Sequence, residues 1–127
     1  MSIDETKEKL TVHVKLFAKA GKLEALLKEL SLLVKSTREE PGCEYSEILQ
    51  NIDDPLLITI VDKFTHYRAF KDHMQMPATR RFIDQMVPEL IEKTHVSFHM
   101  TRIDCIGNQG QPNVEKLSFR EDCRDRH

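Results

Sequence analysis

The spacing of hydrophobic residues changes several times along the chain, and each change marks the boundary of a predicted element. Residues 11–18 alternate between apolar and polar side chains, which is the period of a β-strand. After Gly21 the apolar positions of residues 22–39 recur every three or four residues, as on one side of an amphipathic helix. Pro41 and Gly42 then end this helix.

The rest of the pattern predicts two more strands, a pair of helices and a last strand. Pro77 fits the first position of the second helix of the pair, and Pro88 is expected to end or kink that helix. The predicted ranges are 43–51, 56–64, 66–75, 77–88 and 94–103. Right-handed crossovers turn this order into an α+β, ferredoxin-like split βαβ fold, a four-stranded antiparallel sheet with its helices on one face.

The pattern also predicts that the chain has three regions and forms a homodimer. Residues 11–103 form the domain, residues 1–10 are an N-terminal extension, and residues 104–127 are a glycine- and proline-containing tail. Apolar side chains occupy both faces of several strands, as Leu16 and Phe17 do. Because helices cover only one face, we expect an exposed apolar patch and a homodimer in which two sheets face each other.

Composition narrows the class of protein. The 127 residues carry 19 Lys and Arg against 21 Asp and Glu, a formal net charge of −2, which gives no field for holding nucleic acid or an anionic membrane. The polar N-terminus lacks the features of a signal peptide, so a cytoplasmic location is expected. Cys43, Cys105 and Cys123 form no disulfide or zinc pattern; we expect reduced thiols, with Cys43 buried.

Histidines are the candidates for chemistry, since the chain has no P-loop, dinucleotide-binding or zinc-protease motif. His95 and His99 share one strand face with Ser97, and His13 shares a face with Phe17. These side chains either line a cavity as bases or are rim or core imidazoles bonded to the backbone. No third ligand completes a metal site.

Three short motifs are recognisable in order and spacing. They are Glu40-Pro41-Gly42-Cys43, Asp53-Asp54-Pro55, and Ala69-Phe70 followed by His73 and Pro77. Together with Gly21 they resemble the antibiotic biosynthesis monooxygenase family over residues 11–103. The resemblance implies a dimeric α+β barrel, whose members include cofactor-independent oxygenases of phenols and quinols. Molecular oxygen would be the co-substrate, and neither a cofactor nor a metal is expected.

The resemblance implies that His73 is the catalytic acid/base, or a hydrogen-bond partner of the substrate, in an apolar pocket closed to water. A deprotonated phenol or quinol is electron-rich enough to reduce oxygen itself, so the protein need only orient the ring and supply a base. The residues expected to line the pocket are His13, Phe17, Phe64, Phe70, Phe82, Ser97 and His99.

The chain departs from the family pattern at positions that bear on the reaction. Phe64, Ser46 and Ala78 stand where relatives often carry tryptophan, tyrosine and histidine, and the chain has no tryptophan, which disfavours haem degradation. Two alternatives to an oxygenase stay open. One is a non-catalytic ligand-binding or stress-response dimer. The other is an isomerase of a small phosphorylated sugar, for which Lys15, Lys63 and Arg102 are the strand-borne cations.

Overall fold

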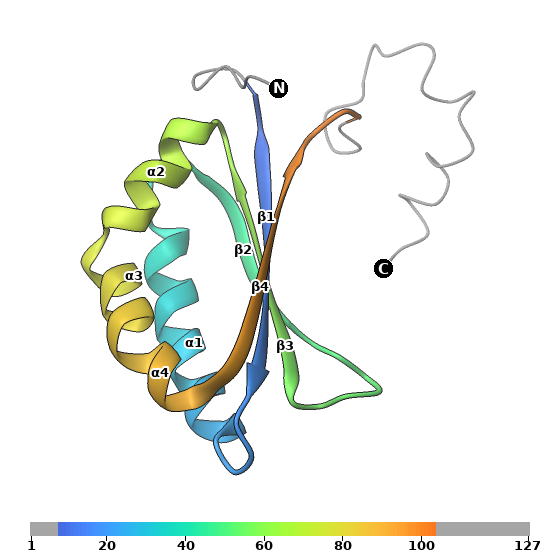
Figure 1. Cartoon of the computed structure of the whole chain (residues 1–127). Coiled ribbons are helices and arrows are strands. Elements are labelled where there is room, and N and C mark those ends of the chain that lie inside the picture. The colour runs from blue at the N-terminus through green and yellow to red at the C-terminus, as the bar shows by residue number, and fades with distance from the viewer. Residues whose placement is uncertain (1–7, 104–127) are drawn as a thin grey trace.

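The computed structural model describes residues 8–103, and its elements follow the expected order (Figure 1). The strands are β1 (Leu10–Ala18), β2 (Cys43–Gln50), β3 (Leu57–Phe64) and β4 (Ile91–Met100). The helical segments are α1 (Leu23–Arg38), α2 (Tyr67–Gln75), α3 (Pro77–Arg81), the π-helical turn η1 (Phe82–Met86) and α4 (Val87–Leu90).

The four strands form one antiparallel sheet in the order β2-β3-β1-β4. Seen edge-on in Figure 1, the sheet has all its helices on one side. This arrangement confirms the predicted α+β, ferredoxin-like fold. The sheet is open, with β2 and β4 as its edges. No helix within residues 8–103 has the length and apolar character needed to cross a membrane.

Alternation along the strands gives the sheet a covered face toward the helices and an open face away from them. On the paired central strands, the covered face carries Val12, Val14, Leu16, Ile58, Ile60, Asp62 and Phe64. The open face carries Thr11, His13, Lys15, Phe17, Leu57, Thr59, Val61 and Lys63 on the same strands, His95, Ser97 and His99 on β4, and Tyr45, Glu47 and Leu49 on β2.

The main core lies between the covered face and the apolar stripe of α1. Leu26, Leu30 and Leu33 follow the helical spacing and pack with Leu16 and Ile58. Leu26, Leu30 and Ile58 are completely buried. Each such side chain contributes about 1.5–3 kcal/mol by leaving water. This burial fixes α1 over the centre of the sheet, so the helices after β3 cover the remaining part.

The segment after Pro77 differs from the prediction. The helical path runs past Pro88 to Leu90, and β4 therefore starts at Ile91 rather than at residue 94. Just before the proline, the N–H of Val87 bonds to the carbonyl of Phe82, five residues back. A proline ring clashes with the carbonyl four residues earlier and cannot donate to it. The wider π-turn accommodates Pro88 without ending the helix.

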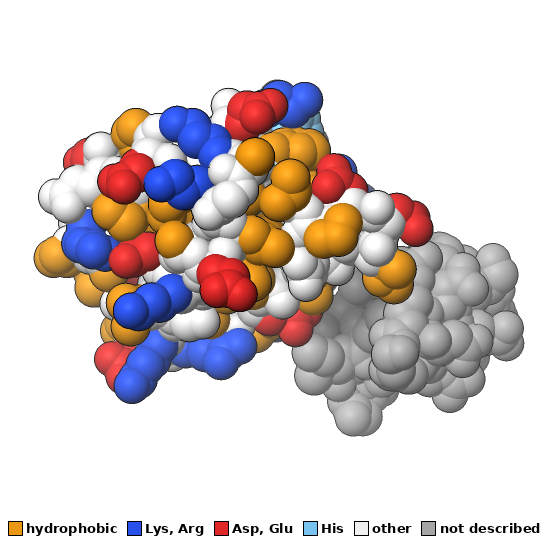
Figure 2. All heavy atoms as spheres, turned by 90° about the horizontal axis from the view of Figure 1, so that it is seen from below, with side chains coloured by type: hydrophobic (Ala, Val, Ile, Leu, Met, Phe, Trp, Pro, Cys, Tyr) orange, Lys and Arg blue, Asp and Glu red, His pale blue; other side chains and the backbone are white. Residues whose placement is uncertain are grey.

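The open face is mixed rather than uniformly apolar. Tyr45 and Leu49 are 40% and 47% exposed, whereas Val61 and Lys63 on the central strand are nearly buried by their neighbours. The end of the molecule seen in Figure 2 likewise intersperses apolar groups with charges of both signs. Residues 1–7 of the predicted extension and the whole predicted tail, with Cys105 and Cys123, lie outside the described residues, and Leu10 of the extension already belongs to β1.

Candidate functional site

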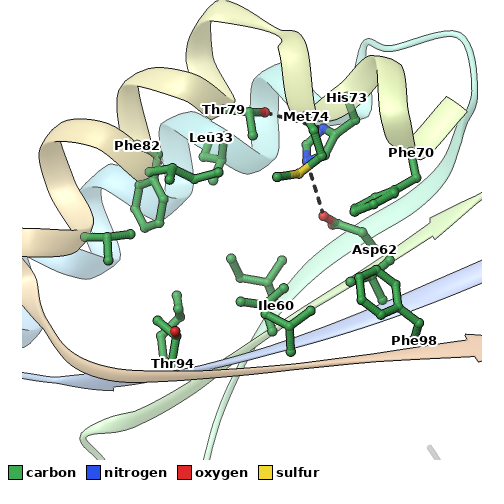
Figure 3. Close-up of a pocket in the computed structure, with 16 residues that line it drawn as sticks. Leu33, Ile60, Asp62, Phe70, His73, Met74, Thr79, Phe82, Thr94 and Phe98 are labelled. Atoms are coloured by element: carbon green, nitrogen blue, oxygen red, sulfur yellow. Dashed lines mark hydrogen bonds and ion pairs between the residues drawn. The ribbon is translucent and has the colours of Figure 1, made fainter.

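A cavity of about 410 Å³ lies between the covered face and the helices (Figure 3). Its volume is that of a typical pocket for a small organic molecule. Four of its sixteen lining residues are polar, namely Asp62, His73, Thr79 and Thr94. The apolar lining consists of Val12, Val14, Leu16, Leu33, Ile60, Phe70, Met74, Phe82, Ile83, Val87, Val96 and Phe98. The cavity therefore suits a largely apolar ligand.

His73 projects into this cavity from the last turn of α2. The helix is capped by the His66 side chain, whose Nδ1 accepts the N–H of Ala69 at 3.1 Å. Nδ1 of His73 lies 3.0 Å from both carboxylate oxygens of Glu40. Since an ionised carboxylate only accepts hydrogen bonds, Nδ1 carries a hydrogen and donates it to Glu40. In the neutral imidazole with this tautomer, Nε2 of His73 carries the lone pair.

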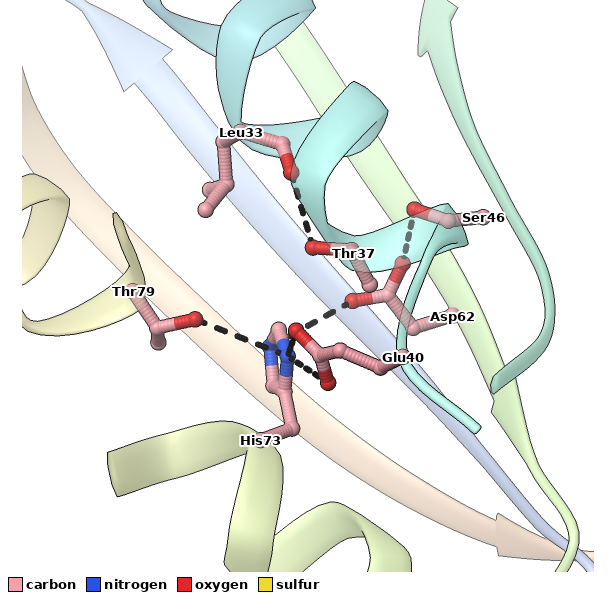
Figure 4. A network of polar contacts seen from close by, with 7 residues as sticks. All are labelled: Leu33, Thr37, Glu40, Ser46, Asp62, His73 and Thr79. Carbon is pink, nitrogen blue, oxygen red and sulfur yellow. Dashed lines mark hydrogen bonds and ion pairs between the residues drawn. The ribbon is translucent and has the colours of Figure 1, made fainter. Parts of the chain in front are cut away.

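Asp62 faces that lone pair from the covered face of β3. Its Oδ2 is 3.9 Å from Nε2 of His73, and its Oδ1 accepts a hydrogen bond from the Ser46 hydroxyl on β2 (Figure 4). Burial is the largest influence and raises the pKa of Asp62. The Ser46 hydrogen bond and His73 oppose this rise, and Glu40 adds to it. The side chains of His73, Glu40 and Asp62 are only 8%, 8% and 10% exposed.

A close approach of two backbone segments brings Glu40 to His73. A Cβ atom added to Gly42 would lie 2.3 Å from the Cβ of Ala69, so only glycine fits where the α1–β2 turn meets α2. The carbonyl of Gly42 also accepts the N–H of Thr65 at 2.9 Å. The two sequence motifs thus have one physical explanation: the glycine and the alanine let the turn dock on α2, and docking places Glu40 against His73.

Aromatic rings surround the outer part of this site. Phe64 is completely buried, and its ring centroid lies 5.2 Å from the His73 ring and 5.8 Å from that of Phe70. Phe70 in turn contacts Phe98 edge-on at 5.4 Å. Phe98 is 53% exposed on the edge strand β4, so it lies where the cavity meets solvent.

The predicted pocket residues divide between the two faces of the sheet. His73, Phe70 and Phe82 line the cavity, and Phe64 packs behind His73. The remaining four residues predicted for the pocket do not line the cavity; they are His13, Phe17, Ser97 and His99. Their placement in the pocket is corrected, because strand alternation puts them on the open face. There the His13 and His99 rings lie 4.6 Å apart, and Ser97 Oγ lies 3.0 Å from His99 Nε2.

The cations considered for a phosphate group do not reach the cavity either. Lys15 and Lys63 lie on the open face, and Arg102 is exposed beyond β4. Within the described part of the chain, the lining of this cavity contains no lysine or arginine. The same part of the chain brings no three His, Cys, Asp or Glu side chains together in a way that could hold a metal ion.

Sequence reasoning missed the polar partners of His73. Glu40 belongs to a recognised motif but was given no role, and Asp62, Ser46 and Thr79 were not considered as site residues. A signal for Asp62 was present: it continues the alternation of Ile58 and Ile60 toward Phe64 and so belongs on the buried face. The hydroxyl of Thr79, 3.5 Å from Nδ1 of His73, comes from a helix whose position depends on tertiary packing.

Cys43 is half-buried rather than buried. Burial first, and then the charges of Asp62 and Glu40, raise the pKa of its thiol to about 11. A thiol in this surrounding holds its proton at neutral pH, which makes it a poor nucleophile. Cys43 therefore plays a packing role beside the polar site.

Comparisons with known proteins place the chain in a family. The family model for antibiotic biosynthesis monooxygenase matches residues 9–85. No curated protein gives a significant match. Protein SO0527 from Shewanella oneidensis, whose structure is solved, shares 32% sequence identity with this chain. The two structures align with a TM-score of 0.73, and the alignment covers 79% of this chain and 95% of that one. PA3566 from Pseudomonas aeruginosa is 23% identical, with a TM-score of 0.72 over 79% of this chain and 100% of that one. The chain belongs to the antibiotic biosynthesis monooxygenase family.

Proposed function

We propose that the protein is a cofactor-independent monooxygenase of a phenolic or quinol-type molecule, with His73 as its acid/base. The observation that carries this proposal is the arrangement at the cavity end. There, Glu40 holds Nδ1 of His73 at 3.0 Å, and Nε2 faces Asp62 at the wall of an apolar cavity. A carboxylate that orients an imidazole in this way makes it a competent base. Family membership supports monooxygenase chemistry.

The proposed reaction balances with oxygen as the only co-substrate. His73 Nε2 takes the hydroxyl proton of the substrate, and the ring of the resulting phenolate supplies electrons to oxygen. One oxygen atom forms a new bond to a ring carbon, and the other leaves as water with two hydrogens from the substrate. A hydroquinone thereby becomes a hydroxyquinone, losing four electrons as oxygen gains four. The apolar walls would keep solvent from the reduced oxygen intermediate.

Two copies of the chain complete the proposed assembly. The open face carries half-exposed Tyr45 and Leu49 beside polar groups, and all helices of residues 8–103 lie on the other side of the sheet. Pairing of two such faces would bury these side chains around a two-fold axis. The cavity lies on the opposite side of the sheet, so each copy keeps its own site.

Oxygen uptake tests the function directly. The native protein is supplied with a panel of reduced quinones and polyphenols, and heat-denatured protein corrects for spontaneous oxidation. His73→Ala is expected to lower the protein-dependent rate about 100-fold or more, because it removes the base. His95→Ala, which changes an exposed histidine on the open face, is expected to keep the native rate. Labelled oxygen should place one of its two atoms in the organic product.

Each contrary result has a distinct meaning. Uptake that His73→Ala leaves unchanged would remove His73 as the base. Oxidation without label in the product would show an oxidase rather than a monooxygenase. Ligand-dependent thermal stabilisation with no uptake across the panel would favour the ligand-binding dimer.

A further inference from the structure

The polar end of the cavity contains two carboxyl groups and a single imidazole, so negative groups outnumber positive ones. Glu40 and Asp62 are both nearly buried beside the single imidazole of His73. The Nε–H of Arg38 bonds to the backbone oxygen of Ser46, and the described lining contributes no lysine or arginine. With both carboxylates ionised, this group would carry a net charge of −1 even with a doubly protonated imidazole. A buried charge without a partner is costly.

Two positions are open to one further proton, Nε2 of His73 and the carboxyl of Asp62. Glu40 receives Nδ1–H of His73, whereas Asp62 has, within residues 8–103, the Ser46 hydroxyl as its one hydrogen-bond partner. Burial raises the pKa of Asp62 against the opposing effects of Ser46 and His73. The 3.9 Å between Oδ2 and Nε2 is too long for the hydrogen bond that would hold Asp62 in its ionised form.

Among the described residues, the charge of Asp62 also reaches Cys43 and Tyr45, which supply no positive charge, and the guanidinium of Arg38 lies on the far side of Cys43 and Ser46. Burial first and the charge of Asp62 second raise the pKa of the Cys43 thiol. Burial, Glu47 and then Asp62 raise the pKa of the Tyr45 hydroxyl. Both groups are neutral when protonated, so they cannot balance a second carboxylate. Burial and the charge of Glu40 favour the neutral form of Asp62 by raising its pKa.

We propose that Asp62 is protonated in the resting site and is a second catalytic residue, a hydrogen-bond donor that selects an uncharged hydroxyl over an anion. This inference rests on the proposed function, because it assigns the other half of the same acid/base site. Asp62 would bind the oxygen that His73 deprotonates.

The distances suit a ligand oxygen held by both side chains. An oxygen about 2.8 Å from each of Nε2 and Oδ2 fits between atoms that are 3.9 Å apart. The ligand hydroxyl gives its proton to Nε2, and the O–H of Asp62 donates to the oxyanion that forms. The group, ligand included, has the same net charge before and after this transfer, since imidazolium and oxyanion form together. A carboxylate or phosphate ligand would instead add negative charge beside Glu40.

Binding of two matched probes tests the selectivity without relying on turnover. Calorimetry at pH 7 compares 2-naphthol, which is neutral, with 2-naphthoate, which has the same ring system and a negative charge. The native protein is expected to bind 2-naphthol at least ten times more tightly. Asp62→Asn keeps a neutral donor and should retain 2-naphthol affinity within about threefold, whereas Asp62→Ala should lose about tenfold. Circular dichroism verifies that both variants fold.

Infrared spectroscopy of the native protein tests the protonation itself. The native-minus-Asp62→Asn difference spectrum at pH 7 should contain the C=O band of a protonated carboxyl, and 2-naphthol should shift that band. The matched control, native minus Glu40→Gln, should contain no such band. If Asp62→Asn fails to fold, the native band and its shift with 2-naphthol still decide the question.

Several results would overturn the inference. They are an ionised Asp62, a native protein that does not bind 2-naphthol or binds naphthoate as well, and loss of 2-naphthol binding in a folded Asp62→Asn. A different set of results would show that the proposed function fails while the inference on Asp62 holds. In that case 2-naphthol binds and Asp62 is protonated, yet no reduced quinone or polyphenol supports oxygen uptake.

Discussion

The two faces of the sheet hold histidines in opposite surroundings. On the covered side His73 is buried, donates to Glu40 and borders an apolar cavity. On the open face His13 lies against the ring of His99 and near Lys15, and burial, His99 and Lys15 together lower its pKa. One histidine has acidic partners and the other has basic ones. His73 comes from a helix over the covered face and His13 from a strand, so the neighbours of an imidazole are a better guide to function than the number of histidines.

The largest difference between the faces should appear in stability. Ile58→Ala removes a completely buried side chain from the covered face and is expected to lower the free energy of unfolding by about 2–5 kcal/mol. Leu49→Ala acts on a side chain that is 47% exposed on the open face, and should cost less than about 1 kcal/mol in dilute protein. Urea titrations of the two variants measure both values.

The same Leu49 variant examines the pairing of open faces. Sedimentation at micromolar concentration should show two native chains together and a weaker association for Leu49→Ala. A well-folded lone native subunit at that concentration would contradict the dimer. Equal losses of stability in the Ile58 and Leu49 variants would contradict the distinction between covered and open faces.

A smaller effect is expected at the contact that assembles the site. Gly42→Ala forces its new Cβ against Ala69 and should cost about 1–3 kcal/mol in urea unfolding. It should also lower oxygen uptake, because the turn can no longer hold Glu40 at His73. Gly21→Ala is the matched control: its φ of 78° also strains alanine, but nothing lies within 4 Å. A folded Gly42→Ala protein with native uptake would show that this docking is not needed.

The smallest effect concerns acid stability and the open face. A folded-state pKa of His13 below its ordinary 6.5 means that the unfolded chain binds the proton more readily. His13 therefore contributes stability that is present above pH 6.5 and lost as the pH falls through its lower folded pKa. His13→Gln should reduce the loss of unfolding free energy between pH 7.5 and 5.5, as urea titrations at the two pH values would measure. An unchanged slope in His13→Gln would remove His13 as the source.

Local periodicity was sufficient for most of the fold. The alternation in residues 11–18 and the helical spacing after Gly21 predicted β1 and α1 to within one residue at each end. The start of β4 was missed because Pro88 ordinarily ends a helix, whereas here a π-turn accommodates it. That turn depends on how the helix packs and leaves no simple periodic signal.

The site was less predictable than the fold, since it combines residues that are distant in sequence. The family motif identified His73, but its contact with Glu40 spans 33 positions. His13, Ser97 and His99 were placed in the pocket by residue type although alternation set them on the other face. Asp62 is the opposite case. It is a charged residue, but the alternation along β3 places it on the covered face, so the sequence indicates its burial without knowledge of its partners.

The missing side chain of Gly42 gives this enzyme family member an unusual sensitivity at a distance. One methyl group gained at that glycine would press on Ala69 of α2, the helix that carries His73, although Gly42 itself does not line the cavity. If the proposed function holds, such a variant would react more slowly without any change in a residue that lines the ligand cavity.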